Sequence, residues 1–461
     1  MASESRSFPG AATSEPEPQI ASRRTTEAAI PRSISLATAR PRLLNGADYL
    51  MLGFDHDLRK EGFAGNSCQI LLELDTALPG EALQSRLDEL HGRFPLSGAR
   101  PRGVLHPHWI PNTTKLPVQT VRVHQESPTL PEKLLNEPLD SRRGELLRFD
   151  LIEHADEHST VVFTWNHALM DAPGAEHFLA MIGRGDLPWL DGDSPAASAG
   201  ARSRLADRLR LAWKSLHHLD QFCRAAPRSP GLRRPDAGAR LRYRVETFSG
   251  EETATVRANA SKLCGVLGAA QFHAAVALVE LHRLHQRLGC ASPSYVLPVP
   301  VGLRPKGGIE PVFSNQVGML MLQLLPEQLE TTAQAVGELK KQTTDSMRSG
   351  LLESGRVLCE MFRFLPLPIY MAMVKQGLRG EICSLFYGDS GQVSPLLTNF
   401  LGLPIRDFTH IAAVTPSPGV GVIFFSFAGK LRVTVLHLET VLSEAEAAGY
   451  AAGLRASLLE P

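Results

Sequence analysis

The segment TVVFTWNHALMDAPG, residues Thr160–Gly174, decides how the rest of the chain is interpreted. It opens with β-branched and aromatic residues that stop just before His167, which is typical of a buried strand. A Pro-Gly pair interrupts the pattern, and from Ala175 onward apolar residues return at helical spacing. The polar cluster His167–Asp171 is therefore predicted to lie in a turn between a strand and a helix, where catalytic residues are common.

The rest of the chain repeats this alternation. An apolar stripe with Leu83, Leu87 and Leu90 predicts an early helix, and the spacing Ser443 to Glu446 predicts a capped helix at the end. Further β-like runs are Cys68–Asp75, Tyr295–Val301, 318–325, 420–427 and 431–438, and a long helix is expected over Ala269–Leu288. Strands alternating with helices in both halves predict an α/β fold.

Composition divides the 461 residues into four parts. Residues 1–40 are rich in Ser, Pro, Glu, Thr and Arg and are expected to form a disordered tail. Residues 41–190 and 245–461 each contain their own strands and helices and are expected to form two lobes. Residues 191–244, rich in Pro, Gly, Ser and Arg, are expected to link the lobes.

The linker contains a predicted amphipathic helix. Its apolar face would consist of Leu205, Leu209, Ala212, Leu216 and Leu219, and its basic face of Arg202, Arg204, Arg208, Arg210 and Lys214. Such a basic face is usually solvated, and the alternative is peripheral contact with an anionic membrane.

Charge and cysteine content exclude several classes of protein. The 48 basic and 48 acidic residues give a net charge of zero, so no nucleic acid partner is indicated. The six cysteines form no Cys-x-x-Cys pair, and no His-Glu-x-x-His occurs, so no metal site is expected. Without a signal peptide pattern or an uncharged apolar run of about 20 residues, we expect a cytoplasmic protein, with association at a membrane surface as the alternative.

His167 is the candidate catalytic residue. A neutral imidazole at cellular pH can remove the proton from an acceptor hydroxyl or amine. Asp171, four residues later, can turn back beneath the loop as a brace, and a buried carboxylate there needs a cationic partner.

The segment Thr164–Gly174 resembles the His-His-x-x-x-Asp-Gly signature of condensation domains, wax ester synthase/diacylglycerol acyltransferases and other members of the chloramphenicol acetyltransferase-like superfamily. Two positions depart from it, since Asn166 replaces the first histidine and Ala172 the glycine. The alanine adds a Cβ where the backbone is expected to approach the substrate or to take a positive φ.

Five flanking segments, in the same order as in that family, extend the resemblance over about residues 41–458. They are Arg93–Leu96, Leu139–Arg148, Val299–Arg304, Ser314–Gly318 and the wax-ester-synthase-like Thr398–Gly402.

The resemblance implies two chloramphenicol acetyltransferase-like α/β lobes around a central tunnel, with His167 as the general base where donor and acceptor meet. It also implies an ion pair between Asp171 and Arg304, which is favoured over the alternative that Arg304, beside a proline, is an ordinary surface residue. Asn166, Asn315, Thr398 and Asn399 are the candidate contacts to substrate or oxyanion. For Asn399, a turn cap and an oxyanion donor fit equally well.

The function implied is transfer of an acyl group from a thioester to an alcohol or amine. No bound cofactor or metal is required, and the co-substrate is acyl-CoA or the phosphopantetheine of an acyl carrier protein. The wax-ester-synthase-like segment favours acyl-CoA and a lipophilic alcohol. The alternatives are a carrier-dependent condensation enzyme of a peptide or polyketide pathway, and a binding protein of the same family without turnover.

Overall fold

The computed structural model describes residues 41–91, 95–103, 105–111, 121–125, 130–141, 143–184, 204–230, 238–265, 268–304, 311–376 and 378–461. The predicted tail, residues 1–40, lies outside the described residues, as do 191–203 and 231–237 of the predicted linker. The disorder of the tail therefore stays a prediction.

A six-stranded sheet positions the His167 segment. Its strands run in the order β12 (Asn399–Phe400), β13 (Leu403–Ile411), β2 (Ser67–Leu74), β7 (Ser159–Asn166), β6 (Leu147–Glu153) and β5 (Val121–Gln125). Neighbouring strands are antiparallel, except that β5 and β6 are parallel. Two of the strands thus come from the last 63 residues of the chain.

The central strands of this sheet are buried on both faces. On one face, Leu72 and Phe163 pack in a core that includes apolar residues of the helices α2 (Gly80–His91) and α4 (Ala172–Gly183). On the other face, Leu71 and Val162 belong to a second core. Because successive strand residues point to opposite faces, near-continuous apolar runs suit β2 and β7.

The second core surrounds a four-stranded sheet with the order β11 (Phe386–Gln392), β14 (Val420–Phe427), β15 (Lys430–Leu438) and β8 (Leu241–Thr247). Strands β11 and β14 are parallel, and the other pairs are antiparallel. The helices α6 (Gly250–Cys264), α7 (Ala269–Arg287) and α11 (Glu444–Leu459) contribute to the same core. Ser443 and Glu446 form the capping box of α11, as their spacing predicts.

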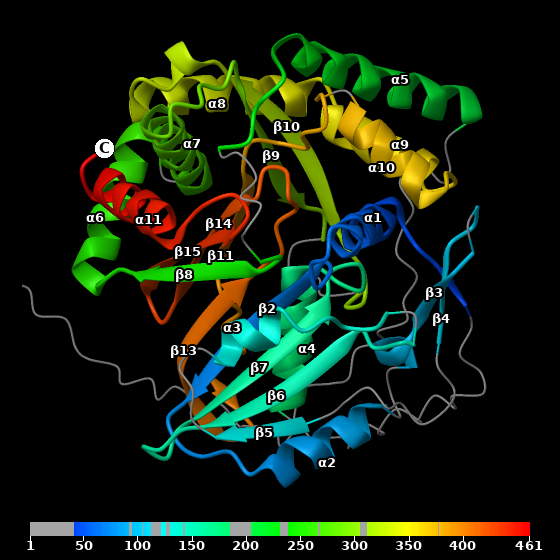
Figure 1. Cartoon of the computed structure of the whole chain (residues 1–461), viewed down its shortest axis with the longest axis vertical. Coiled ribbons are helices and arrows are strands. Elements are labelled where there is room, and N and C mark those ends of the chain that lie inside the picture. The colour runs from blue at the N-terminus through cyan, green and yellow to red at the C-terminus, as the bar shows by residue number, and fades with distance from the viewer. Residues whose placement is uncertain are drawn as a thin grey trace, which may run out of the picture. The chain divides into compact units, whose positions relative to one another are not determined.

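The remaining elements are a strand pair, a small sheet and several helices (Figure 1). Strands β9 (Tyr295–Gly302) and β10 (Val317–Leu324) pair antiparallel, and β10 contacts α8 (Thr332–Arg348) and α9 (Leu351–Phe362). Helix α5 (Leu205–Phe222) packs on α9. Helix α10 (Leu367–Gln376) packs on α1 (Gly46–Lys60). Helix α3 (Leu130–Leu135) contacts β2 and β8. The three-stranded sheet has the order β1 (Arg42–Leu43), β4 (His108–Ile110) and β3 (Arg100–Arg102). Short 3₁₀ turns lie at Pro95–Gly98, Cys223–Ala225 and Pro326–Gln328.

The predicted α/β fold is confirmed. Each β-like run named from the sequence is a strand, and the helix expected after His167 begins three residues earlier than predicted, at Ala172. The lobe boundaries at 190 and 245 stay a prediction, although β12 and β13 join the sheet that is built mainly from residues 67–166. Within the described ranges no single helix is long and apolar enough to span a membrane; α6 and α7 pass that test only as a pair bent by 96°.

Candidate active site

His167 lies in the turn that joins β7 to α4. The strand ends at Asn166, and the amide of Leu169 closes the turn by donating to the Asn166 carbonyl at 3.0 Å. Asp171 is the N-cap of α4, where its Oδ1 accepts from the Gly174 amide at 3.0 Å. The imidazole therefore stands between the carboxyl end of a strand and the amino end of a helix.

The backbone of His167 is held on both sides. Its amide donates to the Asn66 carbonyl at 2.9 Å, and its carbonyl accepts from Asn315 Nδ2 at 2.9 Å. Asp55 of α1 fixes the surroundings, because its Oδ1 accepts from the Asn66 amide at 2.9 Å and from Asn166 Nδ2 at 3.0 Å. This network leaves the turn little freedom to move relative to α1.

The amino end of α1 anchors Asn315. Asn45 is the N-cap, and its Nδ2 donates to the Asn315 carbonyl at 3.0 Å. Asp48 Oδ1 accepts from the Asn315 amide at 2.7 Å and from Asn315 Nδ2 at 3.0 Å. Burial raises the pKa of Asp48 to about 6, against the opposing effects of Arg42 and the Asn315 donors. Asn315 Nδ2 is thus shared between the Asp48 carboxyl and the His167 carbonyl.

The imidazole of His167 is half-buried, and its Nδ1 is buried with no well-formed hydrogen bond to the described residues. Asn315 Oδ1 is likewise buried without one. Burial lowers the pKa of His167, while the backbone carbonyl of His167, the Asp171 carboxylate and the Asn315 amide act in the opposite direction. The ring is therefore neutral at cellular pH and able to accept a proton.

Asp171 and Arg304 form the ion pair that the sequence analysis expects. Arg304 Nη1 donates to Asp171 Oδ2 at 2.5 Å, and the Gln316 amide donates to the same oxygen at 2.8 Å. Only 8% of the Asp171 side chain and 12% of the Arg304 side chain are exposed. One oxygen of Asp171 accepts from Gly174 of α4, and the other accepts from Arg304 and Gln316. The carboxylate therefore connects the start of α4 to these two residues.

Two predicted contact residues support the turn instead of presenting free donors. Asn166 is fully buried; its Nδ2 donates to Asp55, and its Oδ1 accepts from the Ala168 amide at 3.0 Å. Asn315 is 2% exposed and donates to Asp48 and to the His167 carbonyl. Their positions favour a role in holding His167 over the predicted contact with substrate.

Thr398 and Asn399 do not meet His167, and this corrects the prediction of an oxyanion contact. Asn399 pairs with Pro404 of β13, at the end of the sheet where Ile405 faces Leu74 of β2. Asn166 faces Ser67 at the opposite end of β2. Asn399 and Asn166 are therefore separated by about eight residues of strand, or about 25 Å. Both side chains are exposed, and Asn399 Nδ2 donates to Thr398 Oγ1 at 3.4 Å.

Ala172 does not need the positive φ that was expected at this position. It is the first residue of α4, and it is absent from the described residues with positive φ. A different close contact lies two residues later, between the backbone of Gly174 and that of Val312. A Cβ added at Gly174 would lie 2.5 Å from the Val312 carbonyl oxygen.

Gly174→Ala is therefore expected to destabilise the fold and to disturb the Asp171–Arg304 pair, because the Val312 backbone oxygen cannot yield as a flexible side chain would. We expect the free energy of unfolding to fall by about 1–3 kcal/mol, measured by chemical denaturation. Gly250→Ala is the matched control, since Gly250 opens α6 and a Cβ there meets nothing within 4 Å. Equal stability of the two variants would contradict the prediction.

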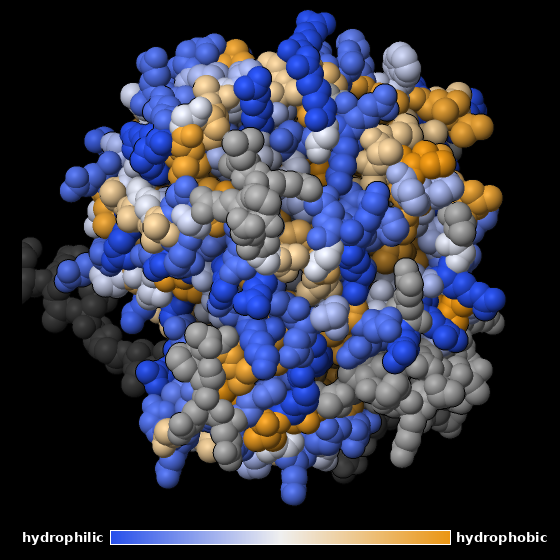
Figure 2. All heavy atoms as spheres, viewed as in Figure 1, coloured by the Kyte–Doolittle hydropathy of each residue, from blue (hydrophilic) through white to orange (hydrophobic). Residues whose placement is uncertain are grey.

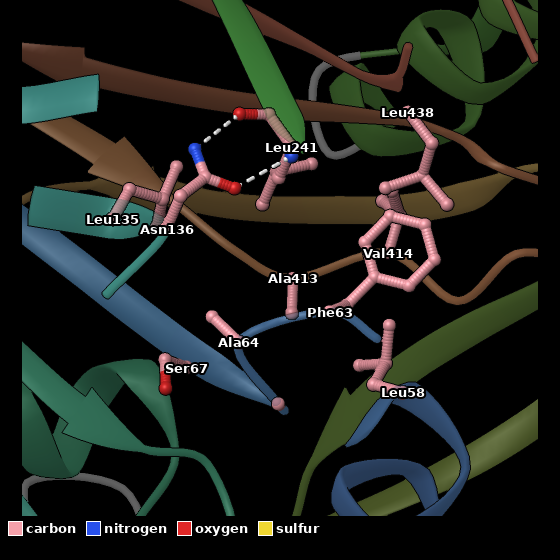
Figure 3. Close-up of a pocket in the computed structure, with 11 residues that line it drawn as sticks. Leu58, Phe63, Ala64, Ser67, Leu135, Asn136, Leu241, Ala413, Val414 and Leu438 are labelled. Carbon is pink, nitrogen blue, oxygen red and sulfur yellow. Dashed lines mark hydrogen bonds between the residues drawn. The ribbon is translucent and has the colours of Figure 1, made fainter. Parts of the chain in front are cut away.

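A mostly apolar pocket lies beside this site, at the start of β2 (Figure 3). Its cavity of about 10 Å³ has room for about one water molecule. The lining residues are Leu58, Phe63, Ala64, Gly65, Ser67, Leu135, Asn136, Leu241, Ala413, Val414 and Leu438. Asn136 Nδ2 donates to the Leu241 carbonyl at 2.8 Å, and the Leu241 amide donates to Asn136 Oδ1 at 2.8 Å. The buried Ser67 hydroxyl has no hydrogen-bond partner among the described residues. Ser67 is the strand partner of Asn166, the residue before His167, so the pocket lies next to the turn that carries His167.

Sequence reasoning missed Asn45, Asp48, Asp55 and Asn66, which hold the turn from α1 and the loop after it. The spacing of Asn45 and Asp48 is a capping-box signal that reveals the start of α1. No local pattern reveals that Asp48 also binds Asn315, 267 residues away. No group of three or more His, Cys, Asp or Glu residues placed to hold a metal ion occurs in the described part of the chain.

No family model and no curated protein matches the sequence. Solved structures do match over nearly the whole chain. TRI3 trichothecene 15-O-acetyltransferase from Fusarium sporotrichioides is 13% identical with a TM-score of 0.67, covering 91% of this chain and 95% of its own. The first condensation domain of the CDA synthetase is 14% identical with a TM-score of 0.66. The match covers 92% of this chain and 97% of that domain. A variant of the starter condensation domain of rhizomide synthetase, in complex with C8-CoA, is 14% identical with a TM-score of 0.59, covering 90% and 93%.

These similarities show the fold, which is the one shared by that acetyltransferase and by condensation domains. The chloramphenicol acetyltransferase-like fold class implied by the sequence is thereby confirmed. The narrower resemblance to wax ester synthases stays a prediction.

Proposed function

We propose that the protein is an acyltransferase in which His167 is the general base. The observation that carries the proposal is the half-buried, neutral imidazole of His167, in a turn that is fixed by α1, Asn315 and the Asp171–Arg304 pair. The fold is shared with an acetyltransferase and with condensation domains, and this supports acyl transfer as the reaction class.

The proposed reaction is direct transfer. His167 removes the proton from an acceptor hydroxyl or amine, and the freed electron pair attacks the carbonyl carbon of the thioester. When the tetrahedral intermediate collapses, the carbon–sulfur bond breaks and the imidazolium returns its proton to the leaving thiolate. The imidazole is regenerated, and the products are an ester or amide and a free thiol.

We further propose acyl-CoA as the donor and a lipophilic alcohol as the acceptor. One solved neighbour is a complex with C8-CoA, and another is a trichothecene 15-O-acetyltransferase. The distance of Thr398 and Asn399 from His167 removes the contact on which the comparison with wax ester synthases would have rested. A carrier-protein donor is the second candidate, because the similar structures include condensation domains of two synthetases and of a polyketide synthase.

The test is to incubate the purified chain with a panel of acyl-CoAs and acyl-loaded carrier protein, each with alcohols and amines, and to measure released thiol. Thiol release from acyl-CoA that depends on an alcohol supports the full proposal. Release from the loaded carrier alone supports the condensation alternative. Ligand binding without release in every combination would contradict acyl transfer and favour a binding protein.

The pH dependence of kcat/KM should show an acid limb from His167. A protonated ring cannot accept a proton, so the rate falls as the pH drops through the pKa of His167 in the free enzyme. Because burial lowers that pKa, the limb should lie below the ordinary value of about 6.5, and activity should persist in mildly acidic buffer. A thiol reagent that reacts at acid pH gives the measurement. A limb at or above the ordinary value would contradict the burial argument.

A further inference from the structure

The outward face of α5 is apolar. Leu205, Leu209, Trp213 and Leu216 follow one another at i, i+4, i+8 and i+11, so they lie on one side of the helix. We call these four residues the apolar stripe. Leu205 is 67%, Leu209 50%, Trp213 72% and Leu216 36% exposed. Leu205, Leu209 and Leu216 belong to the apolar face that the sequence predicts for this helix.

An adjoining side of α5 attaches the helix to the protein. Ala212, Ser215 and Phe222 are its buried residues, and Phe222 packs with Val296 and Leu378 in a small core of their own. Helix α5 contacts α9, and Lys214 Nζ donates to the carbonyl of Ser349 at the end of α8. Because the attachment uses this adjoining side, the apolar stripe faces outward as a fixed feature of the surface.

The apolar side chains lie among basic ones. Residues 204–230 contain six basic residues against two acidic ones, a net charge of +4 in a chain whose net charge is zero. Arg204, Arg210 and Lys214 are exposed on α5 itself. Met347, 50% exposed, lies two residues before the Ser349 that Lys214 contacts. Figure 2 shows apolar side chains gathered at the upper right, where Figure 1 places α5, α9 and α10.

The geometry points to an anionic lipid surface as the partner of α5: we propose that the helix lies in the membrane interface with the apolar stripe inserted and the basic side chains at the headgroups. A helix with Leu and Trp on one side and Arg and Lys beside them is suited to that boundary. A protein partner of standard size would need about 20–30 residues on each side, whereas the stripe offers four. The charge favours anionic lipid over neutral lipid.

Co-sedimentation of the full chain with lipid vesicles tests the proposal. We expect binding to vesicles of phosphatidylcholine mixed with phosphatidylglycerol, little binding to phosphatidylcholine alone, and weaker binding at high salt. Arg204→Gln with Arg210→Gln should weaken binding by about 25-fold, from about fivefold per charge lost. Leu209→Ala with Trp213→Ala should weaken it more than about tenfold, since each inserted side chain contributes burial energy.

Two controls keep the result specific. Leu105→Ala removes an apolar side chain that is 59% exposed elsewhere, and Lys430→Gln removes an exposed charge at the start of β15; neither should change binding. None of the six substituted residues belongs to the proposed active site, so thioester cleavage with a soluble acceptor should persist in every variant. Failure of the membrane proposal is thereby distinguishable from failure of the acyltransferase proposal.

Three outcomes would overturn the proposal. The first is equal binding to neutral and anionic vesicles, or to neither. The second is unchanged binding of the Leu209→Ala/Trp213→Ala variant. The third is self-association in the absence of lipid that this variant abolishes, because the stripe would then be an interface between two copies of the chain.

Discussion

His167→Ala is expected to lower kcat for thioester-dependent acyl transfer by roughly a hundredfold to ten-thousandfold, the usual contribution of a positioned general base. Thermal stability should change little, because the contacts of His167 that fix the turn are made by its backbone amide and carbonyl, which alanine retains. The measurement is the rate of thiol release at saturating donor and acceptor, together with a melting curve for each protein. Loss of rate with retained stability separates a chemical role from a structural one.

His282→Ala is the matched control for this substitution. Burial lowers the pKa of His282 as it does that of His167, but His282 lies on α7 and contacts Tyr295 at 3.0 Å. This variant should keep both the parental rate and the acid limb. If His167→Ala transferred acyl groups as fast as the parent, the assignment of the base would be wrong.

Asp171→Asn is expected to reduce both stability and activity. The substitution removes the carboxylate charge that pairs with the Arg304 guanidinium, which is 12% exposed, and breaking a buried ion pair in this way costs about 3–5 kcal/mol. Asp171 also caps α4 and accepts from the Gln316 amide, so the turn that carries His167 loses its brace on two sides. Chemical denaturation gives the stability loss, and thiol release gives the activity.

An exposed ion pair provides the comparison. Asp207→Asn breaks the ion pair with Arg210 on α5, in which the Asp207 side chain is 47% and the Arg210 side chain 79% exposed. This substitution should lower the free energy of unfolding by less than about 1 kcal/mol. The double variant Asp171→Asn/Arg304→Gln should lose less stability than the two single losses added together, because it leaves no charge unpaired. Additive losses would show that the two side chains do not depend on each other.

Local patterns in the sequence predicted most of the secondary structure around His167. The run at 160–165 predicts a strand, and Asp171 stands where an N-cap belongs. The Pro-Gly pair was expected to precede the helix, but Pro173 and Gly174 lie in its first turn. A buried carboxylate needs a cationic partner, and this need predicted an arginine beside Asp171. The family resemblance then identified that arginine as Arg304. Each of these inferences rests on a few adjacent residues or on one pairwise interaction.

The residues that hold the turn could not be found in this way. Asp48 and Asp55 reach Asn315 and Asn166 across 267 and 111 residues, and nothing in their own neighbourhoods indicates those partners. The error at Thr398 and Asn399 has a related cause. A short motif identifies residue types, whereas the register of β13 against β2 decides which end of the sheet the residues occupy. Register is settled by packing over the whole sheet.

The pairing of β13 with β2 has a consequence for synthesis of the chain. Phe408 lies opposite Leu72, a separation of 336 residues, so β2 acquires its second neighbour only after nearly the whole chain has left the ribosome. Until then its backbone donors and acceptors on that side are unpaired, and an open strand edge invites association with other chains. The turn that carries His167 adjoins this same strand through Ser67 and Asn166. Assembly of the sheet that carries this turn is therefore a late event, and a nascent chain that stalls before residue 411 exposes an aggregation-prone edge.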